Sequence, residues 1–384
     1  MAAVTRDLVH ETLELALRIQ TVPAPTFAEE RRSELVFGLF REAGLQEVRR
    51  DAVGSVTGIR PGTANGPAVM VSAHLDTVFG SDTDLHSTRE ADKIAGPGIG
   101  DNSLGVAGLV ALLWMLDGAG LRLPCDLILA ANVREEGLGD LQGMRALIRH
   151  YSARLKAVVV LEGTRLGRIT FQGVGSRRYR VAVRTAGGHS WADFGRRSAV
   201  HELVDLAHEL CALPVPRSPK TTYNIGVIQG GTSINSIAAE ASLLLDLRSE
   251  DPGELERLDR TVRKIVHRHR NDEAEVTVEL VGDRPAGSLE PGHPLVRAAM
   301  AAAEAAGVES RVEAASTDAN AALAADVPAV CVGLTRGGHV HTTQEYILIP
   351  PLASGLRQLA ALVVESALLE PDATARKATN TTGG

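Results

Sequence analysis

The 384-residue sequence has few aromatic side chains, only three cysteines and no excess of positive charge. Phe, Trp and Tyr make up 3% of the residues and the formal net charge is −7, so the chain lacks both the stacking platforms and the basic surface that bind nucleic acid. No run of about 18 residues is apolar throughout, which argues against a membrane span. We therefore expect neither a nucleic-acid partner nor a membrane partner.

The three cysteines, Cys125, Cys211 and Cys331, are far apart in the sequence and form no CxxC pair. Each lies in or beside an apolar segment, which predicts buried thiols. Free thiols are typical of a reducing compartment. The N-terminal segment mixes leucines with charges, unlike a signal peptide. These features together indicate a cytoplasmic protein.

The length of the chain exceeds the size at which a single hydrophobic core keeps growing, so two domains are expected. Strand-like apolar runs alternate with helical patterns in residues 1–178 and again in 286–370, which predicts an α/β domain with a mixed sheet flanked by helices. Residues 179–285 follow the order strand, helix, two strands, helix, strand, which predicts an inserted ferredoxin-like α+β domain. The polar tail, 371–384, is expected to be disordered.

Several hydrophobic runs end in side chains that bind metal ions. Ligands of α/β sheets bind at the carboxyl ends of the strands, where these side chains are expected. Imidazole nitrogen and carboxylate oxygen suit zinc and similar ions in hydrolytic sites. The sequence therefore predicts a two-metal hydrolase, from His74 and Asp76 in VSAHLDTVF, Asp101 in GPGIGDNS, Glu135 and Glu136 in ANVREEG, Glu162 in VVVLEGT, and His341 in GGHVHTTQE.

Each of these motifs taken alone has a simpler explanation. An HxD after a strand is more often a polar turn, and the pair Glu135 and Glu136 could begin a solvated helix. GPGIGD is similar to a dinucleotide-binding loop, but Asp101 stands where the third glycine would be and would repel a pyrophosphate. No GxSxG elbow supports a serine hydrolase. Only the complete set of motifs specifies the metal site.

The order of the motifs HLDTV, GIGDN, REEG, LEGT, GGHS, GGTSIN with LDLR, and HTTQE closely resembles that of the M20 family of metallopeptidases and amidohydrolases, over roughly residues 10–370. The resemblance implies a catalytic α/β domain with two divalent metal ions, usually zinc, although manganese or cobalt would suit the same ligands. It also implies a lid domain that often mediates dimerisation, so a homodimer is expected. The implied activity is cleavage of an amide bond in a small peptide or an N-acyl amino acid.

The resemblance assigns five side chains to the two ions. One ion takes His74, Asp101 and Glu162, and the other takes Asp101, Glu136 and His341. Asp101 would bridge the ions, because a carboxylate offers two oxygens to two cations.

Three further residues receive catalytic or supporting roles from the resemblance. Glu135 corresponds to the general base, which takes a proton from water and delivers it to the leaving amine. Asp76 corresponds to a carboxylate that supports the metal ligands. His189 in GGHSW corresponds to a lid histidine that supports the oxyanion, in dimers often from the partner chain.

The resemblance matches Asn235 and Arg248 to lid positions that bind a substrate carboxylate, although Arg248 could instead pair with Asp246 or Glu250 on the surface. Among related two-zinc peptidases, Glu at the position of Glu162 tends to accompany carboxypeptidases and deacylases, which favours that type. The segment SWADFG is similar to peptidase T-like sequences, which leaves an aminopeptidase of the same family as an alternative. A non-catalytic binding protein with this fold is a further alternative, but it would be expected to have lost a ligand or Glu135.

Overall fold

The computed structural model describes residues 4–370, and the chain divides into two compact units. Unit 1 comprises residues 1–173 and 288–384, and unit 2 comprises residues 174–287. The sequence predicts the same interruption but places the junctions after residues 178 and 285. The predicted disordered tail, 371–384, lies outside the described residues.

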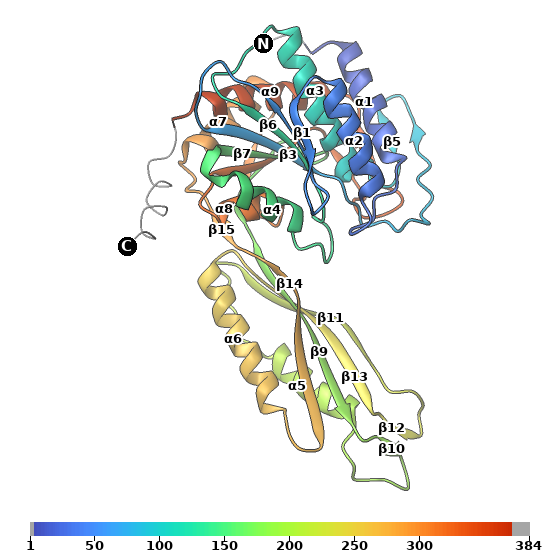
Figure 1. Ribbon diagram of the computed structural model, residues 1–384. Helices are drawn as coiled ribbons and strands as arrows, with labels where there is room; N and C mark the ends of the chain where they lie inside the picture. Colours follow the sequence, from blue (N-terminus) through green and yellow to red (C-terminus); the bar gives the residue numbers. More distant parts are fainter. Residues whose placement is uncertain (1–3, 371–384) are drawn as a thin grey trace. The chain divides into compact units, whose positions relative to one another are not determined.

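Unit 1 is built on a mixed sheet with helices on both faces (Figure 1). Its central strands β6, β3, β7 and β17 are parallel, while β2 and β8 pair with this block in the antiparallel sense. The predicted α/β class with a mixed sheet is confirmed. In spatial order the strands are β1 (Gln46–Arg50), β2 (Val56–Arg60), β6 (Leu127–Asn132), β3 (Ala68–His74), β7 (Leu155–Glu162), β17 (Ala329–Gly333) and β8 (Arg168–Gly173), with β16 (Arg311–Ala315) beside β8.

The two faces of this sheet are covered by different helices because strand side chains alternate between faces. In β3, Val69 and Val71 join one apolar core and Met70 joins another. Both faces are therefore buried, as expected for parallel strands. The first core contains α1 (Arg6–Gln20), α2 (Glu30–Glu42), α3 (Leu104–Gly118), α7 (Pro294–Ala305) and α9 (Leu352–Leu368), and the second contains α4 (Gln142–Tyr151) and α8 (Ala319–Leu323).

Helix α3 is the most apolar helix of unit 1. Together with the π-helical turn before it, the segment from Ile99 to Gly118 is long and apolar enough to cross a membrane, but 89% of its apolar window is buried inside the structure. That burial is what a core helix shows. The segment carries Asp101 at its start and Asp117 near its end.

A second, small sheet joins two segments that are far apart in the sequence. Strand β19 (Tyr346–Leu348) pairs with β18 (Gly337–Gly338) on one side and with β5 (Lys93–Ala95) on the other, and β5 pairs with β4 (Thr88–Arg89). The pairing fixes the loop between β18 and β19 against the chain that leads to Asp101. The remaining short elements are the 3₁₀ turn Ser152–Arg154 and β15 (Gly287–Ser288).

Unit 2 has the strand and helix order of a ferredoxin-like fold, and its four main strands are all antiparallel in the order β11-β13-β9-β14. Alternate apolar residues of β13, such as Leu243 and Leu245, pack with the two helices on one face of the sheet. Helix α6 begins at a favourable N-terminus, where the Asp251 side chain accepts the Glu254 N–H and proline is the first helical residue. The elements are β9 (Gly175–Thr185), α5 (Ala199–Cys211), β11 (Thr221–Gly230), β13 (Glu240–Ser249), α6 (Pro252–Arg268) and β14 (Ala274–Arg284), with the short pair β10 (Gly188–His189) and β12 (Ser236–Ile237).

Two expectations about unit 2 need correction. Strand β9 starts at Gly175, before the predicted domain boundary at residue 179, because its polar first residues pair with β13 and β14. This pairing is a tertiary effect that leaves no apolar pattern in the sequence. Cys211 is exposed, whereas Cys125 and Cys331 are buried as predicted. The inward face of α5 is occupied by leucines such as Leu206 and Leu210, which turns the last residue of the helix outward.

Candidate metal centre

His74 is the last residue of β3, and its ring orientation is fixed by the backbone that follows. Its side chain is 1% exposed, and Nδ1 lies 3.0 Å from the carbonyl oxygen of Asp76. That carbonyl is only an acceptor, so Nδ1 carries the proton and donates it. Nε2 is then left with its lone pair, directed at Asp101 Oδ1 at 3.0 Å and Glu162 Oε2 at 3.9 Å. This is the tautomer that a metal-binding histidine requires.

Asp101 lies in the turn before α3, and Glu345 holds the backbone of that turn. Glu345 is fully buried, and its Oε1 accepts the N–H groups of Gly100 and Asp101, both at 2.7 Å, while Oε2 accepts that of Gly98 at 3.2 Å. A Cβ at Gly100 would lie 3.1 Å from Glu345 Oε1 and 2.6 Å from the Thr164 side chain, so this close approach requires glycine. The carboxylate of Glu345 therefore determines where Asp101 is presented.

Glu135 and Glu136 follow β6 and are held by a second buried carboxylate. Asp76, fully buried, accepts the Glu135 N–H on Oδ1 at 2.9 Å and the Glu136 N–H on Oδ2 at 2.8 Å. Oδ2 also accepts the hydroxyl of Thr26 at 3.0 Å. The predicted supporting role of Asp76 thus has a specific geometry, in which one side chain fixes the backbone of two site residues and its own carbonyl fixes the His74 ring.

The structure brings each of the two predicted ligand triads together. Ligand atoms of His74, Asp101 and Glu162 lie within 4.8 Å of one another, and so do those of Asp101, Glu136 and His341. His341 Nε2 is 3.0 Å from both Asp101 Oδ2 and Glu136 Oε1. Asp101 thus directs one oxygen to each imidazole, which is the arrangement of a bridging carboxylate. His341 also has φ +67°, a left-handed conformation that is uncommon for a residue with a side chain and typical of functional sites.

The donor set fits divalent cations on the observed contacts. With its proton on Nδ1, His74 faces Asp101 Oδ1 with a lone pair, so two acceptor atoms lie 3.0 Å apart. Asp101 Oδ1 is also buried without a hydrogen-bond donor. A cation would remove this conflict, because it attracts both atoms. Two imidazoles and three carboxylates are the ligand types of zinc, manganese and cobalt hydrolytic sites.

In the absence of a cation, protons would have to balance these charges. Burial disfavours charge on Asp101, but a second ring proton on His341 and on His74 would donate to this carboxylate, which outweighs burial and holds the pKa of Asp101 below its usual range. The hydrogen bonds of His341 with Asp101 and then with Glu136 raise the pKa of His341 to about 10. Burial raises the pKa of Glu136 to about 7 and that of Glu162 well above its usual value, with Asp101 adding to both. The cluster therefore favours added positive charge, which a metal ion could supply.

Two of the predicted residues of unit 2, His189 and Asn235, lie at the paired strands β10 and β12. His189 is exposed, and its Nδ1 accepts the N–H groups of Trp191 and Ala192 at 3.2 and 3.3 Å. Asn235 is exposed in the loop before β12, and its backbone carbonyl accepts the Ser190 N–H at 3.0 Å. The loops of His189 and Asn235 are therefore tied to each other.

Arg248 lies on β13 and pairs with Asp246, with Nε 2.6 Å from Oδ2. This is the contact that the sequence offers as an alternative to substrate binding. Arg178 of β9 shares the same carboxylate at 3.2 Å. The ion pair fixes the direction of the Arg248 side chain, which is 40% exposed.

Three residues of unit 1 that support the site are not singled out by the sequence. Glu345 stands at the end of the quoted motif HTTQE, whereas Arg32 and Asp318 have no motif around them. Arg32 is 1% exposed and donates to the carbonyls of Leu75, Val22 and Gln20. Its guanidinium loses solvation, which lowers its pKa to about 10, while the charge of Asp76 acts in the opposite direction.

Asp318 is fully buried and accepts a hydrogen bond of 2.7 Å from Asn132 Nδ2. Burial, followed by the charge of Glu135, raises its pKa to about 7. Asn132 ends β6 opposite His74 in the neighbouring strand. Asp318 comes from the part of unit 1 that follows the insertion, so only the tertiary structure places it here.

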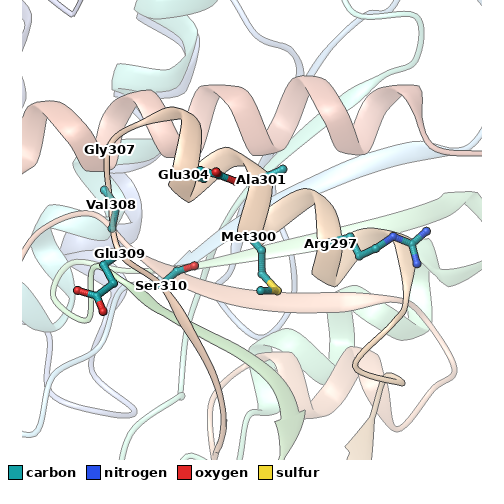
Figure 2. Close-up of a pocket in the computed structure, with 8 residues that line it drawn as sticks. All are labelled: Arg297, Met300, Ala301, Glu304, Gly307, Val308, Glu309 and Ser310. Atoms are coloured by element: carbon teal, nitrogen blue, oxygen red, sulfur yellow. The ribbon is translucent and has the colours of Figure 1, made fainter.

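A groove of about 620 Å³ on unit 1 lies along the end of α7 and the turn that follows it (Figure 2). Its lining includes Arg297, Met300, Glu304 and Val308. These residues are distinct from the triads, so the groove is separate from the candidate metal centre.

Comparisons with known proteins agree with this architecture. Peptidase family M20/M25/M40 matches residues 70–365. Carboxypeptidase G2 of Pseudomonas sp. (strain RS-16) is 27% identical over 376 residues, which cover 93% of this chain and 89% of that protein. The solved structure of aminopeptidase PepT from Bacillus cereus has a TM-score of 0.78 at 21% identity, covering 94% of this chain and 99% of that one. A tripeptidase from Staphylococcus aureus has a TM-score of 0.79 at 19% identity, covering 94% and 98%. At these identities the two structures show a shared fold.

Proposed function

The chain belongs to peptidase family M20/M25/M40, and on that premise we propose that this metal-dependent hydrolase cleaves an amide bond in a small peptide or an N-acyl amino acid. The observation that carries the proposal is the pair of triads that share Asp101. Two divalent ions, with zinc favoured, would be held by His74, Asp101 and Glu162 and by Asp101, Glu136 and His341. Bound there, they would polarise the amide carbonyl and lower the pKa of water.

Glu135 is proposed as the general base. Its carboxylate lies within 4.8 Å of the ligand atoms of His74 and Glu136, and the residue is 6% exposed. Asp76 holds its backbone N–H, so the side chain starts from a fixed position. From there it can take a proton from the attacking water and return it to the nitrogen of the leaving amine.

His189 is proposed to donate a hydrogen bond to the oxyanion. Because Nδ1 accepts two backbone N–H groups, the neutral ring carries its proton on Nε2. The exposed ring therefore presents a donor, as stabilisation of a developing negative charge requires.

A carboxypeptidase or deacylase is favoured over an aminopeptidase. Glu162 at the fourth ligand position supports this choice, as does the similarity to carboxypeptidase G2 over 93% of the chain. Arg248 would bind the carboxylate of the leaving amino acid. Arg248 pairs with Ser176 at one end of the unit 2 sheet, whereas Asn235 lies beyond the opposite end of β13, so Asn235 would reach the same carboxylate from a partner chain. The similarity in fold to an aminopeptidase and a tripeptidase keeps the aminopeptidase as a second candidate.

A homodimer through unit 2 is also proposed. Strand β11 is the edge of its sheet, and Val227 and Ile228 on it are 45% and 54% exposed. A long edge strand with exposed apolar side chains is a surface that another chain can pair with. Sedimentation at several concentrations would test the dimer, and a monomer at all of them would contradict it.

The test of the function combines metal analysis with hydrolysis of a panel of N-acyl amino acids, dipeptides and tripeptides, before and after chelation. We expect about two ions per chain and cleavage that chelation abolishes. Glu135→Gln should retain metal but lose at least about 100-fold in kcat, whereas Glu304→Gln, a matched change on the exposed face of α7, should not change it. Metal-loaded protein that hydrolyses no member of the panel would refute the proposed substrate class.

A further inference from the structure

One end of unit 2 carries three large apolar side chains that are almost fully exposed. Trp191, Phe194 and Ile234 are 88%, 91% and 103% exposed. The chain contains only two tryptophans and six phenylalanines, and one of each lies in residues 191–194, in the loop that follows His189. Trp114, the other tryptophan, packs against the core of unit 1. Exposure of this size at neighbouring positions usually marks a binding surface.

The loop that carries Trp191 and Phe194 is held in one shape by internal hydrogen bonds. The His189 N–H donates to Asp193 Oδ2 at 2.8 Å, and the Asp193 N–H donates back to the His189 carbonyl at 2.9 Å. A Cβ at Gly188 would lie 2.8 Å from Asp193 Oδ2, so glycine is needed for the carboxylate to approach. Arg196 pairs with Asp193 at 3.0 Å. The two aromatic side chains therefore lie on a loop whose conformation is fixed by hydrogen bonds and an ion pair.

The same loops carry the polar groups that the proposed function assigns to the substrate. Strand β10 ends in His189 and pairs with β12, which begins directly after Asn235 (Figure 1). The Trp191 N–H is bonded to the His189 ring, and Ile234 precedes Asn235 in the chain. Two polar groups among three apolar side chains have the composition of a small-molecule site, in which a few polar contacts fix the orientation and apolar surface supplies affinity.

We propose that Trp191, Phe194 and Ile234 form an apolar subsite for the acyl half of the substrate, so that the enzyme prefers amides with a long aliphatic or aromatic acyl group. This rests on the proposed function, because it takes His189 as the group beside the scissile carbonyl. The carbonyl belongs to the acyl half, and the backbone N–H of Trp191 is bonded to the histidine that would contact this carbonyl. The carboxylate of the leaving amino acid would lie with Arg248, which is at the other end of the unit 2 sheet from these loops and would come from a partner chain.

A second copy of the chain is a less suitable occupant of this surface. Strand β11 already offers a ten-residue edge with Val227 and Ile228 exposed, which suits chain-to-chain pairing. The aromatic pair instead lies in the same loop as an exposed imidazole donor, which a dimer core would have to bury without a partner. The subsite is thus assigned to substrate, and dimer contact becomes an outcome of the test.

The first experiment compares N-octanoyl-alanine with N-acetyl-alanine as substrates. We expect wild-type kcat/KM to favour the octanoyl compound, and Trp191→Ala with Phe194→Ala to lower that ratio by about tenfold or more, through loss of buried apolar contact. Val204→Ala, at an exposed apolar position of α5, should leave the ratio at the wild-type value. An unchanged ratio in the double variant would overturn the subsite while the hydrolase function stands. Equal loss on both substrates together with loss of the dimer would assign the pair to the interface instead.

The second experiment detects binding without turnover. In the metal-loaded Trp114→Phe, Glu135→Gln protein, Trp191 is the only indole, and N-octanoyl-alanine should move its emission to shorter wavelength more than N-acetyl-alanine does. No movement at concentrations where the octanoyl compound occupies the wild-type enzyme would overturn the subsite. A shift in a protein whose parent hydrolyses no amide would retain the apolar site and refute the proposed function.

Discussion

Replacing Asp76 with asparagine tests how the candidate metal centre is supported, because it changes one atom of a fully buried side chain. The carboxylate accepts three hydrogen bonds, from the N–H groups of Glu135 and Glu136 and from the hydroxyl of Thr26. Asparagine has a single acceptor oxygen, so its NH₂ group must face at least one of these donors. The least disruptive orientation keeps the two bonds on the Oδ2 side and leaves the Glu135 N–H unpaired.

The expected cost follows from these contacts. A lost hydrogen bond to a charged group, with a buried N–H left unpaired, costs about 2–3 kcal/mol. The buried guanidinium of Arg32 also loses the favourable charge of Asp76, which adds to the loss. We therefore expect a decrease of about 2–4 kcal/mol in the unfolding free energy. Because the Glu135 and Glu136 backbone is no longer fixed, metal affinity should also fall by about 10- to 100-fold.

Urea unfolding of the metal-free protein and calorimetric zinc titration would measure the two effects. Asp117→Asn is the control. Asp117 pairs with Arg60, but its side chain is 62% exposed, so the loss of this ion pair should cost less than about 1 kcal/mol. Burial disfavours charge on Asp76, but the neighbouring His74 ring and the N–H groups of Glu136 and Glu135 outweigh it and hold the pKa of Asp76 below its usual range. Its stabilisation is therefore complete above the unfolded pKa and is lost as the pH falls through the folded one, so the variant and wild type should converge in acid. If Asp76→Asn had the same unfolding free energy and the same zinc affinity as the wild type at neutral pH, the reasoning would be refuted.

Three further predictions concern the metal ligands and unit 2. Glu345→Gln weakens the acceptor of the backbone N–H groups around Asp101, so zinc affinity should fall by about 10- to 100-fold in titrations, and an unchanged affinity would contradict its positioning role. The pKa of His341 is raised to about 10 by Asp101 and then Glu136, so below pH 10 metal must displace its proton. Binding should therefore release protons and tighten as the pH rises, and calorimetry giving the same heat in buffers of different ionisation enthalpy would argue against this competition. Arg248→Ala should raise KM for substrates with a free carboxylate and remove the penalty for amidating that carboxylate, and a variant that still discriminates against the amide would exclude the clamp.

The central part of the fold was predictable from the sequence because burial on both faces leaves a continuous apolar signal. Strands β3, β6 and β7 are almost entirely buried, and each appears in the sequence as an apolar run ending in a candidate ligand or close to one. Edge strands have no such signal. Strand β1, QEVRR, is mostly exposed, and β16, RVEAA, is exposed or half-buried. Their pairing partners, more than their own residues, make them strands.

The candidate ligands were predictable for a different reason. Imidazole and carboxylate side chains at the ends of apolar runs are few, and their order along the chain is characteristic of a family. The supporting residues carry no comparable signal, because the sequence around a buried aspartate such as Asp318 does not differ in any recognisable way from the sequence around an exposed one. Its role depends on Asn132, which lies 186 residues away in the sequence.

By itself, the sequence determined the α/β class, the interrupted order of the two units and the side chains able to bind metal, because these depend on hydrophobic period and on the chemistry of single residues. Only the tertiary structure decided that Asp76 and Glu345 hold the backbone of the ligand loops, that the His74 ring presents Nε2, and that the His189 loop exposes two aromatic side chains. These features arise from hydrogen bonds and burial between segments brought together by folding. A linear pattern does not contain that information, because the free energy of each contact depends on where its partner lies.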